Sequence, residues 1–391
     1  MANYEKLADK YWNDIESFAS KMIKIKSYSG EEKELADFVL NKFEELDYDE
    51  IWRDKAGNVV GKIKGANSDK SLILNCHLDT VSVGNEEAWE YPPFSGEVTE
   101  EEIWGRGASD TKGTFALQVY SAAILKKEDM LPDYDIYVTG VVHEEDSGLG
   151  SIILSKNIDA DYAIVGEATE NDIAIGHRGR IRYDVHIKGR AAHASIPEEG
   201  INPHFFMAKF IEKLKYFELE VDEFFGKSSL APTIVKSNED SSNIIPGEIV
   251  LTIDYRNVPS DTPEKIEEKL QKIIDAIDYE GEVVIDRYKF KVRCYTGLEE
   301  EAYQGEPAFS IPNDHELVIK AKNILEKSLD QDVKIKKWEF ATDSGHYKEK
   351  GVDVIGFSPA EIKYCHTVED KINKKMMKKG LIGYISLLNE L

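Results

Sequence analysis

Residues 71–79 have the sequence SLILNCHLD, an apolar run followed at once by a histidine and an aspartate. A short apolar run of this kind predicts a buried strand. Side chains two positions apart on a strand point to the same side. We therefore expect His77 and Asp79 to project together from the point where this strand meets its following loop.

Strands and helices alternate around this segment, which predicts an α/β layer with a mainly parallel sheet. The first part of the chain has expected helices at 5–25, 31–46 and 113–126, and expected strands at 58–64, 71–76, 135–142 and 162–166. After residue 294 the pattern returns, with a helix at 313–329, strands at 333–338 and 352–357, and a helix at 372–390.

The intervening part has a different pattern, in which apolar and polar residues alternate as in half-exposed strands. Strands at 181–187, 231–236, 249–255 and 282–292 and helices at 203–217 and from Pro263 give the order βαββαβ. This is the order of a ferredoxin-like domain. We therefore predict one discontinuous domain, 1–178 and 295–391, with an inserted α+β domain at 179–294.

The composition of the 391 residues excludes several classes of function. Lys and Arg number 49 against 74 Asp and Glu, a net charge of −25, so we expect no nucleic-acid or anionic-membrane partner. No apolar run approaches the roughly 20 residues that cross a bilayer, and the N-terminal segment has no signal-peptide pattern. Three widely spaced cysteines favour a reducing cytoplasm, and we expect Cys76 and Cys365 to be core thiols.

Further candidate ligands lie where sites form in open α/β sheets, beyond the carboxyl ends of strands. Asp110 lies in a glycine-rich loop, residues 105–113, directly before a helix. The others each follow a predicted strand: the pair Glu144 and Glu145, then Glu167, then His366. With His77 they form a set of histidines and carboxylates that is typical of a two-metal hydrolase.

The chemistry of two divalent metals explains these residue types. A carboxylate can bridge two ions about 3.5–4 Å apart, and each ion also takes a histidine and a terminal carboxylate. A histidine ligand usually donates its other N–H to a second carboxylate, a role that suits Asp79. One of the adjacent Glu144 and Glu145 side chains can bind metal while the other takes a proton from water.

These segments resemble the M20 family of metallopeptidases, which includes acetylornithine deacetylase, succinyl-diaminopimelate desuccinylase, aminoacylase, glutamate carboxypeptidase and several dipeptidases. The matching segments occur in order along nearly the whole chain, at 77–81, 105–113, 144–148, 166–169, 192–195 and His366. The loop at 105–113, GRGASDTKG, is most similar to a bacterial branch of the family, the YgeY-like hydrolases.

The resemblance implies two metal sites that share one ligand. One site would consist of His77, Asp110 and Glu167, and the other of Asp110, Glu145 and His366, with Asp110 as the bridge. Asp79 would orient His77. Glu144 would be the general base and later the proton donor to the leaving amine. The implied cofactors are two zinc ions, with cobalt or manganese as alternatives.

The resemblance also makes the inserted domain a lid and a dimerisation domain. His193 matches a lid histidine that stabilises the oxyanion, often from the other subunit. Asn243 and Arg256 match positions that hold the substrate carboxylate, and an arginine suits such a bidentate contact. Gly345 matches a backbone contact near the substrate.

Some residues keep two interpretations. Arg256 either holds a substrate carboxylate or forms a surface ion pair with Asp254. His346 lies in a motif that borders the site in the family, but that motif does not require histidine. The basic cluster at 177–182 is either a solvated hinge, which we favour, or a contact for an anionic substrate.

Taken together, these patterns predict a cytoplasmic homodimer that hydrolyses the amide bond of N-acyl amino acids. A dipeptidase or carboxypeptidase of the same family is an alternative, with a short peptide as substrate. A non-catalytic protein that binds amino acids is a third. The motifs leave the acyl group and the amino acid of the substrate open.

Overall fold

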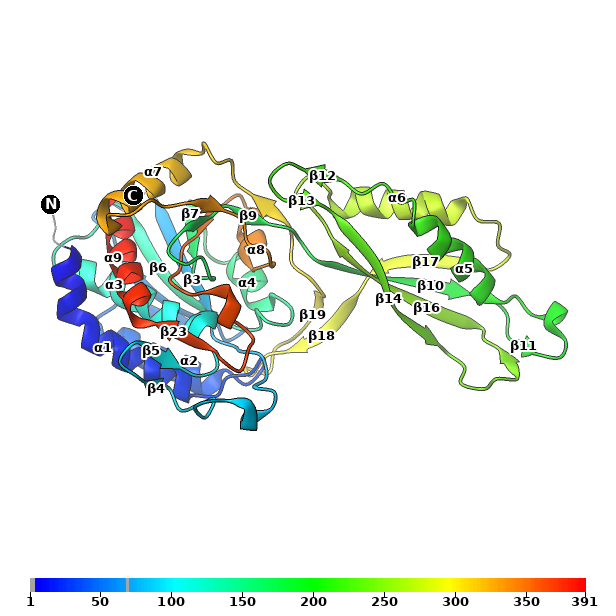
Figure 1. Ribbon diagram of the computed structural model, residues 1–391, viewed down its shortest axis with the longest axis horizontal. Coiled ribbons are helices and arrows are strands. Elements are labelled where there is room, and N and C mark those ends of the chain that lie inside the picture. The colour runs from blue at the N-terminus through cyan, green and yellow to red at the C-terminus, as the bar shows by residue number, and fades with distance from the viewer. Residues whose placement is uncertain (1–3, 68–69) are drawn as a thin grey trace.

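Two lobes joined by extended segments make up the chain in the computed structural model, which describes residues 4–67 and 70–391 (Figure 1). Residues 1–3, the start of the predicted N-terminal segment, lie outside the described residues. The first and the last described helices, α1 (Tyr4–Lys24) and α9 (Lys374–Glu390), both lie in the larger lobe (Figure 1). Within 4–67 and 70–391, no helix has the length and apolar character needed to cross a membrane.

The larger lobe is built on an eight-stranded mixed sheet in which most pairings are parallel, as predicted. The central strands β6, β3, β7 and β22 pair in parallel, whereas β1 and β2 are antiparallel. In sheet order the strands are β1 (Glu50–Arg53), β2 (Val59–Ile63), β6 (Asp135–Val141), β3 (Ser71–His77), β7 (Tyr162–Val165), β22 (Asp353–Gly356), β8 (Ile173–Ala174) and β21 (Ile335–Lys336).

Both faces of this sheet are covered, which explains why Leu72, Ile73 and Leu74 of β3 are apolar in succession. Leu72 and Leu74 belong to one buried cluster, together with residues of the helices that cover that face. Ile73 belongs to a second cluster on the other face, with Leu154 and Tyr347. The helices of this lobe are α1 (Tyr4–Lys24), α2 (Lys33–Glu45), α3 (Gly113–Lys127), α4 (Leu149–Leu154), α7 (Glu316–Leu329), α8 (Ser344–Lys348) and α9 (Lys374–Glu390).

The smaller lobe has the predicted ferredoxin-like order. Its antiparallel sheet runs β14 (Ser229–Ser237), β16 (Glu248–Arg256), β10 (Ile181–Lys188) and β17 (Glu282–Arg287). Two helices, α5 (Pro203–Leu214) and α6 (Pro263–Asp275), lie on one face of it (Figure 1). Tyr183, Val185 and Ile187 of β10 bury their side chains against them, while the alternating residues of β10 face outward.

Short strands complete the two lobes and the connections between them. The three-stranded sheet consists of β23 (Lys371–Asn373), β5 (Glu102–Trp104) and β4 (Glu97–Val98). The two-stranded pairs are β9 (Gly176–His177) with β20 (Phe309–Ser310), β11 (Ala192–His193) with β15 (Ile244–Ile245), β12 (Val221–Asp222) with β13 (Gly226–Lys227), and β18 (Lys289–Arg293) with β19 (Glu299–Tyr303).

The strand predicted at 282–292 is wrong in one respect, because it is two strands in different sheets. β17 ends at Arg287, and β18 begins at Lys289 and pairs only with β19. Between them, Tyr288 donates its backbone N–H to the Arg182 carbonyl oxygen, 2.9 Å away. The predicted domain boundary at 294/295 falls within the hairpin of β18 and β19. The boundaries at 178/179 and 294/295 stay predictions.

Candidate metal centre

The predicted ligands lie at one edge of the larger sheet. His77 is the last residue of β3, and Glu145 and Glu167 follow its parallel neighbours β6 and β7. Because these strands are parallel, their carboxyl ends reach the same edge. Asp110 lies just before α3, and His366 lies between β22 and β23.

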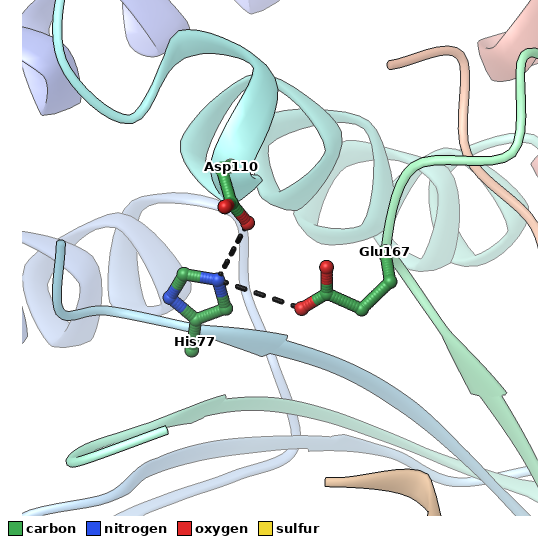
Figure 2. Close-up of side chains that lie close together, drawn as sticks. All are labelled: His77, Asp110 and Glu167. Carbon is green, nitrogen blue, oxygen red and sulfur yellow. Dashed lines mark hydrogen bonds and ion pairs between the residues drawn. The ribbon is translucent and has the colours of Figure 1, made fainter. Parts of the chain in front are cut away.

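Three of these side chains point toward one another in Figure 2. The Nε2 atom of His77 lies 2.9 Å from Oδ1 of Asp110 and 3.5 Å from Oε1 of Glu167. All three residues are buried. One possible ligand atom from each lies within 4.8 Å of the others, a spacing that can hold a metal ion.

A second group of three shares Asp110 with the first. The Nε2 atom of His366 lies 3.0 Å from Oδ2 of Asp110 and 3.0 Å from Oε2 of Glu145. The side chain of His366 is 53% exposed, so this group opens toward solvent. Asp110 therefore turns one carboxylate oxygen to each group, which is the arrangement that a bridging ligand requires.

The electrostatics of the cluster fit divalent cations. Burial raises the pKa of the Glu167 carboxyl well above its usual value, and the nearby Asp110 adds to the shift. Burial also raises the pKa of Glu145, again with a contribution from Asp110. Burial opposes ionisation of Asp110 too, but hydrogen bonds from His366 and His77 outweigh it and lower its pKa. A cation at each group would relieve this crowding of carboxylates, and the mixed nitrogen and oxygen ligands suit zinc, cobalt or manganese.

Protonation of the two histidines responds to the same carboxylates. Burial opposes protonation of His77, but the contacts with Asp110 raise its pKa well above the usual value. Hydrogen bonds to Asp110 and Glu145 raise the pKa of His366 to about 10. With its pKa at about 10, His366 is therefore protonated at neutral pH when no cation is bound, and the pKa of His77 is shifted in the same direction.

Asp79 lies beside His77, but its carboxylate makes a different contact from the predicted one. Its backbone carbonyl oxygen lies 2.8 Å from Nδ1 of His77, whereas its nearest carboxylate oxygen is 3.8 Å away. The carboxylate instead accepts the backbone N–H groups of Glu144 and Glu145, both at 3.1 Å. It also accepts the hydroxyl of Ser29 at 2.7 Å. Asp79 thus fixes the turn that presents the two glutamates.

Glu144 lines a cavity of about 170 Å³ together with Asp110, Glu145, Glu167 and His366. Burial raises the pKa of the Glu144 carboxyl well above its usual value; His77 opposes the shift, and Glu167 and Glu145 add to it. The rest of the wall, which could not be predicted from the sequence, consists of Phe340, Ala341, Ile362 and Cys365. No sequence motif marks these residues as cavity residues. Cys76 is buried as expected, and Cys365 is partly buried and packs against the core cluster of the larger lobe.

Two of the predicted substrate-contact residues lie far from this cluster within one chain. His193 belongs to β11, at the far end of the smaller lobe (Figure 1). Asn243 lies beside it, because the Asn243 carbonyl oxygen accepts the backbone N–H of Ala194 at 2.8 Å. Both side chains are exposed. The structure therefore brings the five predicted ligands and Glu144 together, and leaves His193 and Asn243 apart from them.

Arg256 and Gly345 have local structural partners. The Nε atom of Arg256 donates to Oδ1 of Asp254 at 2.7 Å, which is the ion pair that the sequence analysis weighed as an alternative. Gly345 is buried in α8, where an added Cβ would lie 2.2 Å from the Pro307 carbonyl oxygen. The close approach of Pro307 is therefore one reason why this position needs glycine.

His346, whose role the sequence leaves open, and the basic cluster at 177–182 also have partners within the chain. His346 is buried, with Nε2 2.7 Å from Oε2 of Glu306. His177 is buried beside Thr342, and burial lowers its pKa to about 4. Within the same cluster, Arg180 pairs with Asp254 and Arg182 with Asp184, and Arg178 donates to the Lys227 carbonyl oxygen. The members of the cluster thus have partners within the chain, and the buried His177 is not solvated. The hinge stays a prediction.

Comparison with known proteins agrees with this geometry. A model of peptidase family M20/M25/M40 matches residues 73–390. The chain is 29% identical over 370 residues to the uncharacterised protein YgeY of Escherichia coli K12, covering 93% of this chain and 91% of that protein. It is 24% identical to a probable succinyl-diaminopimelate desuccinylase of Staphylococcus aureus MSSA476, covering 94% of each. It also shares the fold of YXEP from Bacillus subtilis, described as a dinuclear metal-binding M20 peptidase, with a TM-score of 0.72, 14% identity and coverage of 97% of this chain and 98% of that one.

Proposed function

This chain belongs to peptidase family M20/M25/M40 and is a hydrolase of amide or peptide bonds, and on that premise we propose that it is a two-metal deacylase of N-acyl amino acids. The observation that most supports the two-metal centre of this proposal is the position of Asp110. Its two carboxylate oxygens face two separate histidines, at 2.9 and 3.0 Å. A base candidate, Glu144, lines the same cavity.

In this proposal each ligand group holds one divalent metal ion. Zinc is the expected metal, and cobalt or manganese can replace it. His77 and Glu167 complete one site, His366 and Glu145 the other, and Asp110 bridges them. Bound metals would polarise the scissile carbonyl and lower the pKa of a water. The protein residues then handle the proton: Glu144 accepts it from the attacking water and returns it to the leaving amine.

The position of the Glu144 carboxyl is fixed through its backbone. Asp79 accepts the N–H groups of Glu144 and Glu145, so the base and a metal ligand are held by one buried carboxylate. Burial raises the pKa of the Glu144 carboxyl, which favours proton uptake by this group.

The substrate carboxylate is assigned to Arg256 and Asn243, with a backbone contact from Gly345. His193 would stabilise the oxyanion from a second subunit, because it lies at the far end of the smaller lobe within its own chain. This proposal makes the protein a homodimer through the lobe at 179–294. Exposed apolar side chains on that lobe support it, among them Phe205, Tyr216, Ile234 and Val235. We place the enzyme in the cytoplasm.

A peptidase is the second candidate, because YXEP, which has the same fold, is described as a peptidase. A dipeptidase or carboxypeptidase would use the same metals and the same base on a short peptide. The third alternative, a non-catalytic amino-acid-binding protein, is less well supported, because the ligand groups and Glu144 are all present.

The experiment that tests the proposal is amine release by protein stripped of metal and reloaded with zinc, cobalt or manganese. Metal-dependent release from N-acyl amino acids, with none from dipeptides, is the expected result. Release from dipeptides alone would replace the deacylase proposal with the peptidase. Tight amino-acid binding without release under any metal would support the non-catalytic alternative.

A further inference from the structure

The loop that delivers Asp110 is held by one buried carboxylate from a distant part of the chain. Asp370 is fully buried and lies in the segment between His366 and β23. Its Oδ2 atom accepts the backbone N–H of Gly107 at 2.7 Å, and its Oδ1 atom accepts that of Ser109 at 2.9 Å. The Asp370 carboxylate thus spans the loop immediately before the bridging ligand.

Three further bonds join the same two segments. Arg106 donates from Nη1 to Oδ2 of Asp370 at 3.1 Å. The backbone N–H of Gly105 donates to the Asp370 carbonyl oxygen at 2.9 Å. The hydroxyl of Ser109 donates to the Lys371 carbonyl oxygen at 2.6 Å. The loop at 105–109 is therefore fixed to residues 370 and 371 along its length.

This attachment relates the two metal groups to each other. His366, a ligand of the second group, lies four residues before Asp370 in the same connecting segment. Asp110, which belongs to both groups, follows Ser109 directly. A shift of the loop against this segment would change the distance between Asp110 and His366, which is 3.0 Å here.

We propose that Asp370 is a positioning residue that holds Asp110 between the two metal positions. The inference rests on the proposed function, since it assumes that both groups bind metal. Asp370 belongs to neither ligand group and does not line the cavity. It acts through the backbone of the loop, as residues behind metal ligands commonly do. A purely structural role would instead reduce stability without a specific loss of metal.

The matched control is Asp261, a second fully buried carboxylate in the smaller lobe. It accepts hydroxyl groups from Tyr255 at 2.6 Å and from Ser228 at 3.2 Å. Asp261→Asn and Asp370→Asn both replace a buried carboxylate with an amide of the same size. In Asp370→Asn, the new NH₂ group would face a backbone N–H, because both carboxylate oxygens accept one.

The test titrates metal-free protein with zinc alone, using a competing chelator, and follows thermal unfolding in parallel. Wild type should bind two ions. Asp370→Asn should weaken at least one site by roughly 10- to 100-fold, while Asp261→Asn keeps both affinities. Ser109→Ala removes the hydrogen bond to Lys371 and leaves the Asp370 carboxylate in place, so it should weaken zinc binding less. It provides the test if Asp370→Asn does not fold.

The possible results distinguish failure of the two-metal proposal from failure of the positioning role of Asp370. Wild-type protein that binds no zinc would overturn the two-metal proposal itself. Two ions in wild type, with unchanged affinities in Asp370→Asn and Ser109→Ala, would overturn the positioning role alone. Equal losses of zinc affinity in Asp370→Asn and Asp261→Asn would also overturn it, because they would reflect general destabilisation.

Discussion

The two carboxylate oxygens of Asp110 face two histidines, His77 and His366, which are far apart in the sequence. The distances of 2.9 Å to His77 and 3.0 Å to His366 make it the one side chain common to both groups. Each other ligand belongs to a single group. Loss of the shared ligand should therefore have a larger effect than loss of a terminal one.

We predict that Asp110→Ala binds neither metal tightly, whereas His366→Ala loses one ion and keeps the other. His366 contributes to one group only, and the first group keeps His77, Asp110 and Glu167. Metal content after gel filtration, measured by mass spectrometry of the elements, distinguishes the two variants. Two ions retained by Asp110→Ala would contradict the bridging role.

Metal binding should also release protons. The pKa of His366 is raised to about 10 by Asp110 and Glu145, and that of His77 is raised by Asp110. The His366 imidazole is thus protonated at pH 7 without metal and must lose that proton to bind it. Zinc affinity should therefore fall as pH falls from 9 to 6. Calorimetry in buffers of different ionisation enthalpy would measure the release; binding without proton release would refute this account.

The ligands could be predicted from sequence because each follows a strand or starts a helix, and parallel strands end at one edge. The carboxylate contacts of Asp79 and Asp370 could not be predicted in this way. Both bind backbone N–H groups of other loops, and such contacts depend on the path of the folded chain. For the same reason, no local sequence pattern predicts that Phe340 and Ile362 line the cavity.

At the scale of elements, periodicity predicted most strands of both sheets, but it missed β1 and β8 and did not show where one strand ends and the next begins. β17 and β18 form one continuous β-like pattern, and only the pairing partners separate them. The turn at Tyr288 is set by its hydrogen bond to Arg182, which belongs to another strand. Long-range pairing of this kind is invisible to local pattern.

The short pair β11–β15 leads to a prediction about subunit exchange. His193 lies on this pair, far from the metal groups of its own chain. If it acts in the other subunit, His193→Ala and Glu144→Gln should each be nearly inactive alone. After unfolding and refolding together, they should recover roughly a quarter of the wild-type rate, because half of the dimers then contain one complete site.

The two variants refolded separately and then assayed as a mixture provide the control for this experiment. Recovery that appears only after joint refolding supports a shared site. A mixture that stays inactive while a mixed dimer is demonstrated by differential tagging would contradict the role of His193 across subunits.

At the scale of the whole molecule, the larger lobe holds the metal groups, the base and Gly345, and the smaller lobe holds His193, Asn243 and Arg256. The described residues of one chain therefore do not bring together all the groups that the proposed reaction needs. The net charge of −25 fits a small-molecule substrate better than a nucleic acid. In the proposed homodimer, the smaller lobe of one chain brings these residues to the metal groups of the other.

In the proposed reaction, Glu144 moves the proton at a metal centre but is not itself a metal ligand. The most direct measurement is metal content and initial rate of Glu144→Gln, with Asp146→Asn on the same turn as the control for loss of a carboxylate. We predict that Glu144→Gln keeps two ions and loses roughly 10²- to 10⁴-fold in kcat, while Asp146→Asn stays within a few-fold of wild type. Turnover near the wild-type rate in metal-loaded Glu144→Gln would contradict the account.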